Sequence, residues 1–144
     1  MTTYEALASL LAAYAYARDT RDTDGAVACF AEDAEAFGLT GQEDLRRFLE
    51  RVHKLQVADR RHVFTNLALI ADGGDTATMR AYETLYTIAD GKISLAVTGT
   101  VELKARRVDD CWLIHGMTLD LDIPYAPEDL AGVFPLDDDR RFHG

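Results

Sequence analysis

Apolar residues near the N-terminus of the chain recur three or four positions apart, the spacing of one helical face. The positions on this face are Tyr4, Leu7, Leu11, Tyr14 and Ala15. The spacing predicts an amphipathic helix with Thr2 or Thr3 as its N-cap. A shorter helix carrying Val27 and Phe30 is expected next, ending at the acidic pair Glu32–Asp33.

A short strand and a third helix are expected to follow. Residues 34–39 predict the strand, and Gly41 precedes a helix whose first turn carries Glu43 and Asp44. Acidic side chains in the first turn favour a helix because they interact well with its dipole. The apolar face of this helix consists of Leu45, Phe48, Leu49, Val52 and Leu55.

The second half of the chain changes to the alternating pattern of β-strands. Long strands are predicted at residues 62–70, 76–88, 92–108 and 111–123, with polar turns between them. Consecutive hairpins form an antiparallel meander, and the helices that precede it are expected to cover one of its faces. The pattern therefore predicts an α+β domain over residues 1–123 and a C-terminal tail over 124–144.

The composition and net charge of the chain limit the kinds of molecule that it is expected to bind. The chain has 144 residues and a formal net charge of −10, which argues against nucleic acid because phosphate binding needs clustered positive charge. No apolar run approaches the ~20 residues of a membrane helix, and the N-terminus lacks the basic region of a signal peptide. With two cysteines outside any C-x-x-C pair, Cys29 and Cys111, we expect a cytoplasmic protein with two buried thiols and no membrane contact.

Asp19 is the first candidate for chemistry. It continues a helical stripe of small side chains formed by Ala8, Ala12 and Ala15, which leaves room beside the carboxylate. The alternative is a purely structural role. A carboxylate near a helix C-terminus opposes the dipole, and a neighbouring arginine could compensate for it without any function.

His62 is the second candidate, and it begins a predicted strand. The alternate positions of that strand are His62, Phe64, Asn66, Ala68 and Ile70. If this set faces the interior, His62 and Asn66 need partners, since unpaired buried polar groups cost about 1–3 kcal/mol each. Asp19 is a natural partner, because a carboxylate fixes the tautomer of an imidazole and stabilises the imidazolium. The alternative is a surface histidine at a frayed strand end.

Three stretches of the sequence match one known family in order and spacing. They are residues 14–34 with the ending F-x-x-D-A, the helix after Gly41, and residues 61–82, followed by Trp112. Together they resemble the SnoaL-like proteins of the nuclear transport factor 2-like superfamily, over roughly residues 4–123. The resemblance implies a cone-shaped, curved, mainly antiparallel sheet covered by N-terminal helices (the cystatin-like α+β barrel) and a homodimer.

One branch of this superfamily pairs an aspartate of the first helix with a histidine on a long strand. It includes proteins similar to scytalone dehydratase, bile-acid 7α-dehydratase and hexachlorocyclohexane dehydrochlorinase. The resemblance implies that these two residues are Asp19 and His62, and that Tyr14 is a pocket hydrogen-bond donor. Scytalone dehydratase has a second pocket histidine on the third long strand, where this chain has threonines such as Thr98, and His115 lies on the last strand instead.

The expected catalytic residues are therefore Asp19, His62 and Tyr14. The expected substrate-binding residues are Phe64, Asn66, Tyr82, Thr98 and His115. The outer sheet face around Tyr82 and Thr98 is also the expected dimer interface, and His53 and His143 are interpreted as surface residues. The sequence has no metal-ligand or nucleotide-binding motif, so neither a metal nor a cofactor is expected.

These residues predict a cofactor-independent lyase or isomerase acting on a small hydrophobic, cyclic substrate. His62 would remove a proton from carbon, Asp19 would hold the ring, and Tyr14 would stabilise the developing oxyanion. Two alternatives stay open: a non-catalytic small-molecule-binding protein, and a partner subunit resembling the small subunit of ring-hydroxylating dioxygenases. The tail is expected to close the pocket mouth with Val133 and Phe134.

Overall fold

Helices and a short pair of strands form the first part of the chain. Helix α1 (Thr3–Asp19) is followed by α2 (Thr23–Ala28), β1 (Phe30–Ala36), β2 (Leu39–Thr40) and α3 (Gln42–Leu55). These bounds belong to a computed structural model that describes residues 1–130. The Thr2 side chain accepts a hydrogen bond from the Glu5 N–H at 3.1 Å, so α1 begins with the side-chain cap that the sequence predicts.

The predicted second helix was too long, because Phe30 belongs to a strand. Helix α2 ends at Ala28, and Phe30 opens β1, where it pairs in parallel with Ile114. Its fully buried ring packs edge-on against Tyr14, with the centroids 5.7 Å apart. Packing against the first helix therefore sets the end of α2 earlier than the helical spacing suggested.

Four long strands and one short helical turn complete the described chain. They are β3 (Asp59–Asp72), β4 (Thr76–Ala89), β5 (Lys92–Val108), β6 (Cys111–Leu121) and the 3₁₀ turn η1 (Glu128–Leu130). In the described residues the strands form a six-stranded sheet in the order β2-β1-β6-β5-β4-β3, antiparallel except for the β1–β6 pair. The predicted α+β class and mainly antiparallel curved sheet are confirmed.

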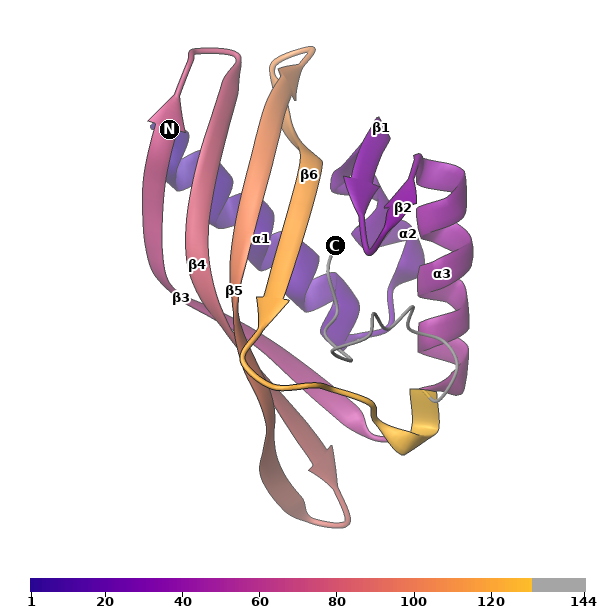
Figure 1. Cartoon of the computed structure of the whole chain (residues 1–144). Coiled ribbons are helices and arrows are strands. Elements are labelled where there is room, and N and C mark those ends of the chain that lie inside the picture. Colours follow the sequence, from indigo (N-terminus) through magenta and orange to yellow (C-terminus); the bar gives the residue numbers. More distant parts are fainter. Residues whose placement is uncertain (131–144) are drawn as a thin grey trace.

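Helix α1 lies across one face of the sheet, and α3 lies beyond β1 and β2 (Figure 1). Alternate positions of β4 point toward α1 and are buried, namely Ala77, Met79, Ala81 and Leu85. On α1, Leu7 and Leu11 are almost fully buried, and each such side chain contributes about 1.5–3 kcal/mol to the free energy of unfolding. This burial fixes which face of α1 packs against the sheet. It therefore also fixes the direction of the side chains in the last turn of α1.

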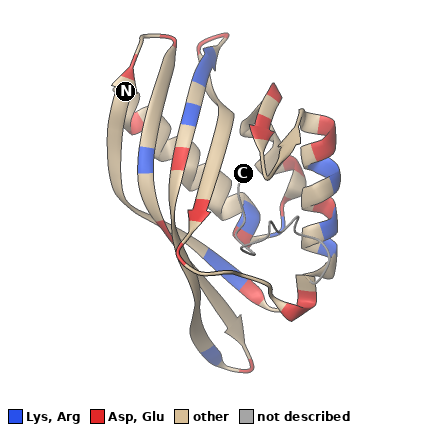
Figure 2. Ribbon diagram, viewed as in Figure 1, with Lys and Arg blue, Asp and Glu red and all other residues tan. Residues whose placement is uncertain are grey.

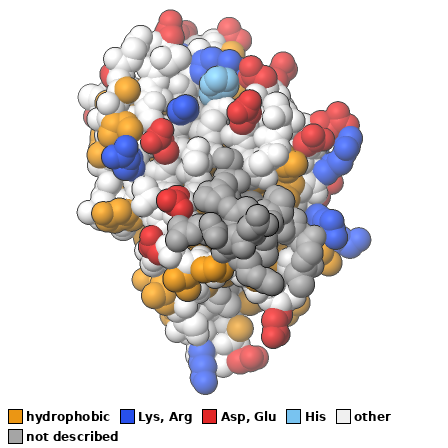
Figure 3. Space-filling view, viewed as in Figure 1, with side chains coloured by type: hydrophobic (Ala, Val, Ile, Leu, Met, Phe, Trp, Pro, Cys, Tyr) orange, Lys and Arg blue, Asp and Glu red, His pale blue; other side chains and the backbone are white. Residues whose placement is uncertain are grey.

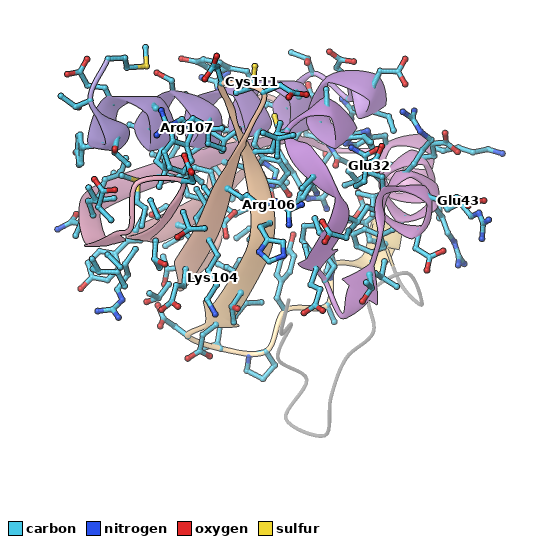
Figure 4. All side chains as sticks on the ribbon, turned by 90° about the horizontal axis from the view of Figure 1, so that it is seen from above. Glu32, Glu43, Lys104, Arg106, Arg107 and Cys111 are labelled. Atoms are coloured by element: carbon cyan, nitrogen blue, oxygen red, sulfur yellow. The ribbon has the colours of Figure 1, made fainter. Side chains whose placement is uncertain are left out.

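Charges of both signs cover the outer surface. Figure 2 shows them along α3, where Arg47 and Glu43 form an ion pair at 2.5 Å. On β5, Lys104 and Arg106 lie on the side away from α1 (Figure 4), and Arg106 binds Asp33 of β1 at 2.6 Å. Such exposed pairs contribute little to stability.

Apolar side chains are exposed on the lower part of the sheet in Figure 3. The exposed set includes Tyr82, Ile93 and Leu95 of β4 and β5. This face contains part of the expected dimer interface, which stays a prediction. Among residues 1–130, no helix combines the length and apolar character that a membrane-spanning helix requires.

One thiol differs from its predicted burial. Cys29 is buried, and burial raises the pKa of its thiol to about 11, whereas Cys111 is exposed. The prediction of two buried thiols is therefore wrong for Cys111, which stands directly after the turn at Asp109–Asp110 and begins β6 beyond the core.

Candidate functional site

Asp19 and His62 meet at the end of α1. The Oδ1 atom of Asp19 accepts a hydrogen bond from the backbone N–H of His62 at 2.9 Å and lies 2.7 Å from the ring Nδ1. The side chains are 16% and 8% exposed, respectively. A carboxylate in this position favours a hydrogen on Nδ1, which leaves Nε2 as the basic nitrogen. No hydrogen bond joins Nε2 to a residue within 1–130, and His62 lines both neighbouring pockets.

The connection after α1 holds this carboxylate against β3. Arg21 has a positive φ of 57°, which turns the chain sharply after the helix. Its guanidinium binds Asp59 at 2.8 Å and the carbonyl oxygens of Gln56 and Ala58 at 3.3 Å each. The first turn after α1 is therefore tied to the chain entering β3, three residues before His62.

Two pockets meet at His62. An open groove of about 750 Å³ runs between α1 and β3, and its helical wall is the predicted stripe of Ala8, Ala12, Ala15 and Asp19. A smaller, partly open cavity of about 60 Å³ also includes His62 in its wall, with room for a few waters or a small functional group. His62 and Phe64 line both pockets.

The wall of this smaller cavity is mostly apolar. Its apolar side chains include Phe37, Phe64, Leu85, Val97, Met117 and Leu121. Tyr125 and Leu130, from the segment after β6, also line it. Arg60 of β3 holds this segment through a bidentate ion pair with Asp129, at 2.6 and 3.0 Å. The predicted plug residues Val133 and Phe134 lie outside the described residues, as does His143.

Tyr14 lies in this cavity and is bound to a buried arginine. Its hydroxyl accepts a hydrogen bond from Nη1 of Arg18 at 2.5 Å. The guanidinium lies over the Tyr14 and Phe37 rings, 5.6 and 5.8 Å from their centroids. Burial raises the pKa of the Tyr14 hydroxyl, and the charge of Arg18 opposes this shift. Tyr14 and His62 thus line the same cavity, although no direct contact joins them.

Glu83 is a site residue that sequence reasoning missed. The β3–β4 register places Leu85 opposite His62 and Glu83 opposite Phe64, so Glu83 is a diagonal neighbour of His62 on the cavity face. Burial raises the pKa of its carboxyl group, while the charges of His62 and Arg18 act in the opposite direction. Glu83 alternates with the apolar residues Ala81 and Leu85, a signal that the sequence carried.

His53 is buried rather than on the surface, as the sequence interpretation had it. Its ring is 8% exposed, and Nδ1 lies 2.8 Å from the Thr23 hydroxyl. Burial, followed by the charges of Arg18 and Arg21, lowers the pKa of His53 to about 4. Its position one helical turn after Leu49 on the apolar face of α3 explains the burial.

Four of the expected substrate-binding residues lie outside both pockets. Asn66 is exposed with a positive φ of 55°, at a bulge where the β3–β4 register shifts, so the simple alternation from His62 ends there. Tyr82 is 55% exposed on the outer face, and His115 is exposed on β6. Thr98 donates a hydrogen bond to Asp122 at 2.6 Å. Only Phe64 of this set reaches the cavity.

Within residues 1–130, no three His, Cys, Asp or Glu side chains are placed to share a metal ion. The polar groups of the cavity instead form an acid–base set. They are the His62 imidazole bound to the Asp19 carboxylate, the Tyr14 phenol bound to the Arg18 guanidinium, and the half-buried Glu83 carboxyl group. Groups of this kind can move protons at a bound molecule and stabilise negative charge on its oxygen.

The sheet and the helices that cover it define a cystatin-like α+β fold, as in a solved Nostoc punctiforme structure with a TM-score of 0.73. The SnoaL-like domain family matches residues 1–118, and the chain belongs to this family. No curated protein matches the sequence.

Several solved structures from Novosphingobium aromaticivorans are similar to the chain. One, described provisionally as an aromatic ring hydroxylase, is 32% identical, covers 84% of this chain and 90% of that chain, and has a TM-score of 0.71. A protein provisionally named scytalone dehydratase is 19% identical, with 83% of both chains covered and a TM-score of 0.73. The β subunit of a provisionally named aromatic-ring-hydroxylating dioxygenase is 15% identical, with 92% and 95% covered and a TM-score of 0.76. The last two establish a shared fold alone.

Proposed function

We propose that the protein is a cofactor-independent lyase or isomerase that moves a proton at a carbon atom of a small, hydrophobic cyclic substrate. The observation that carries the proposal is the 2.7 Å contact between Asp19 Oδ1 and His62 Nδ1, with Nε2 left without a partner within residues 1–130. Nε2 then acts as the general base, and Asp19 stabilises the imidazolium that forms. Positioned groups of this kind accelerate proton transfer by about 10²–10⁴.

Glu83 supplies the complementary acid in an elimination. Burial raises the pKa of its carboxyl group and so favours the protonated form. His62 takes the proton from carbon, the electron pair of that bond forms the double bond, and Glu83 gives its proton to the departing hydroxyl, which leaves as water. Proton return from His62 to Glu83, through water if required, restores both groups.

The Tyr14–Arg18 pair serves the oxygen on which negative charge develops. Tyr14 accepts from Arg18 and keeps its own hydroxyl hydrogen for a ligand. A donor that is polarised by a guanidinium stabilises a developing oxyanion in a site from which water is excluded. The larger groove of about 750 Å³, with Leu11 and Phe64 in its wall, has room for the body of a cyclic substrate.

Solvent exchange tests the proposal without knowledge of the substrate. The protein is incubated in D₂O with a panel of cyclic ketones and β-hydroxy ketones, and deuterium incorporation and loss of water are followed by NMR and mass spectrometry. We expect enzyme-dependent exchange at the carbon next to the carbonyl for at least one compound. His62→Gln and Asp19→Asn are expected to reduce the rate by about 10²-fold or more.

Asp75→Asn is the matched control, because Asp75 is exposed at the β3–β4 turn and binds Arg107 at 3.3 Å, outside both pockets. Its rate should equal that of the unsubstituted protein. If His62→Gln exchanges at the unsubstituted rate, the assigned base is wrong. If compounds bind and none is exchanged, the protein is a binding protein instead.

A second candidate is a partner subunit of an aromatic-ring-oxidising assembly. The relative that is 32% identical bears a provisional ring-hydroxylase name, and the dioxygenase β subunit has the same fold. A larger polypeptide that co-purifies in a fixed ratio from the native host would support this candidate. Proton transfer by the isolated protein would favour the lyase or isomerase.

A further inference from the structure

The smaller cavity contains a buried cation that no carboxylate of residues 1–130 binds directly. Arg18 is 7% exposed, and its one hydrogen bond goes to the neutral Tyr14 hydroxyl. Its Nε atom has no partner within residues 1–130, and no carboxylate of that range lies within ion-pair distance of the guanidinium. Burying a charge without a partner is costly. The cavity therefore keeps a positive charge available at its wall.

A second buried group in the same cavity also lacks a partner. Gln56, which ends α3 and is 7% exposed, lines the cavity, and its Nε2 has no hydrogen bond within residues 1–130. Two side chains that are more than nine-tenths buried thus bring unused N–H donors to one small space. Both can serve an acceptor atom of a ligand, and neither is needed to hold the fold through a hydrogen bond at that atom.

The carboxylates near this space do not use these donors. Asp19 binds His62 and lines the groove rather than the cavity. Asp129 binds Arg60 through both oxygens. Glu83 lines the cavity, and its charge interacts with that of Arg18, but no hydrogen bond joins the two. No acceptor within residues 1–130 therefore uses these donors of Arg18 and Gln56, and a ligand oxygen can accept from them.

We propose that Arg18, Gln56 and Tyr14 form an oxyanion-binding corner, and that the substrate is a small apolar ring compound carrying a delocalised oxyanion, either a carboxylate or a phenolate. This inference rests on the proposed function, because it assigns a substrate class to the same cavity. A planar guanidinium matches the two oxygens of a carboxylate and binds a phenolate through charge-assisted hydrogen bonds. The cavity of about 60 Å³ accommodates the charged group, and the ring extends past Phe64, which lines both pockets, toward the larger groove.

Benzoate and benzamide form a matched pair of probes, because they have the same shape and differ in charge. Calorimetry on the full-length protein is expected to show benzoate binding at least about tenfold more tightly than benzamide. Arg18→Met keeps much of the side-chain volume between the Tyr14 and Phe37 rings and removes the charge. This substitution should weaken the affinity for benzoate by about tenfold to a hundredfold. It should change the affinity for benzamide by no more than about twofold. Arg80→Met, on the exposed outer face of β4, is the control and should change neither affinity.

4-Nitrophenol separates the two kinds of oxyanion, because its phenolate and phenol absorb at different wavelengths. Binding to the corner should increase the phenolate fraction at constant pH, and Arg18→Met should abolish the increase. A response to benzoate alone would restrict the ligand class to carboxylates, and a response to 4-nitrophenol alone would restrict it to phenolates. Either result supports the corner.

The inference is overturned if the unsubstituted protein binds benzoate no more tightly than benzamide and does not shift 4-nitrophenol toward the phenolate. It is also overturned if a folded Arg18→Met protein binds benzoate normally. If Arg18→Met does not fold, Arg18→Lys takes its place. It keeps the charge and loses the planar guanidinium, so its affinity for benzoate should lie between those of the unsubstituted protein and of a protein without the charge. His62→Gln separates the two proposals, because it should keep benzoate affinity and lose deuterium exchange.

Discussion

Arg18 and Asp19 are consecutive residues at the end of α1, and their side chains line two different pockets that both include His62. Asp19 lines the larger groove, and Arg18 lines the smaller cavity. Successive residues on a helix point about 100° apart, so the last turn of α1 directs an anion and a cation into two pockets that share His62. At this helix end, Asp19 therefore orients the proposed base, and Arg18 is the residue proposed to bind negative charge.

Asp19→Asn tests the first of these roles. An amide oxygen can still accept the hydrogen bond from the His62 backbone, so the free energy of unfolding should change by about 1 kcal/mol or less. Turnover of a compound found by deuterium exchange should fall by about 10²-fold or more, because the imidazolium loses its counter-charge. Steady-state kinetics should show the loss in kcat more than in KM. A kcat equal to that of the unsubstituted protein would contradict the assigned role.

Two features of the sequence predicted the Asp19–His62 pair. The stripe of small residues leading to Asp19 indicated space beside the carboxylate, and the resemblance to dehydratase-like proteins indicated His62 as a partner. The hydrophobic pattern also placed the long strands correctly, because alternation and polar turns are local features. These parts depend on residues close together in the chain or on a known motif order.

The rest of the site depends on packing that local patterns do not report. Arg18 falls on the buried face of α1 with Leu11 and Tyr14, and Glu83 falls on the buried face of β4, yet each resembles an ordinary solvated charge in isolation. Asn66 was assigned to the interior because a bulge is invisible to strict alternation. A charged residue at a core position of a helix or strand is the sequence feature that indicates such a group in the interior.

Glu83→Gln should change how stability depends on pH. Burial raises the pKa of the Glu83 carboxyl above its usual 4.5 in the folded protein, against the effects of His62 and Arg18. The folded state therefore retains a proton that the unfolded state has lost, and stability falls as pH rises from about 4.5 through the folded-state pKa. Urea unfolding across this range should show a weaker fall for Glu83→Gln, which is expected to be the more stable protein at neutral pH.

Glu102→Gln is the control for this titration. Glu102 lies on the outer face of β5, where its side chain is 38% exposed and 3.8 Å from Arg80. Its replacement should leave the pH dependence of the unsubstituted protein intact. Parallel stability curves for Glu83→Gln and the unsubstituted protein would mean that the Glu83 carboxyl ionises normally in the cavity.

Asp129→Ala tests the contact that holds the segment after β6 over the cavity. Arg60 is 6% exposed, and the substitution leaves its charge without the bidentate partner. Removing one member of a buried ion pair costs about 3–5 kcal/mol, which unfolding in urea would detect as a lower midpoint. Glu128→Ala, at an exposed position of the same turn, should shift stability by about 0.5 kcal/mol or less. Equal stability of the two variants would show that the ion pair does not hold this segment in solution.

His53 predicts a loss of stability in acid. Burial is the main cause that lowers the pKa of His53 from 6.5 to about 4. The charges of Arg18, Arg21 and His62 act in the same direction, and the charge of Asp22 opposes them. The neutral ring stabilises the fold above pH ~6.5, and this contribution, at most about 3 kcal/mol, is lost as pH falls toward 4. His53→Gln should flatten this part of the stability profile, whereas His115→Gln, at an exposed ring, should not. An unchanged acid profile for His53→Gln would contradict the burial of the ring.

The tautomer of His62 tests the central claim most directly. Two-bond ¹H–¹⁵N correlation spectra of histidine-labelled protein, recorded at a pH where the ring is neutral, distinguish a hydrogen on Nδ1 from one on Nε2. The 2.7 Å contact with Asp19 predicts the hydrogen on Nδ1 and an unprotonated Nε2, with a mixture of tautomers in Asp19→Asn. A neutral ring with its hydrogen on Nε2 in the unsubstituted protein would contradict the assignment of His62 as the base.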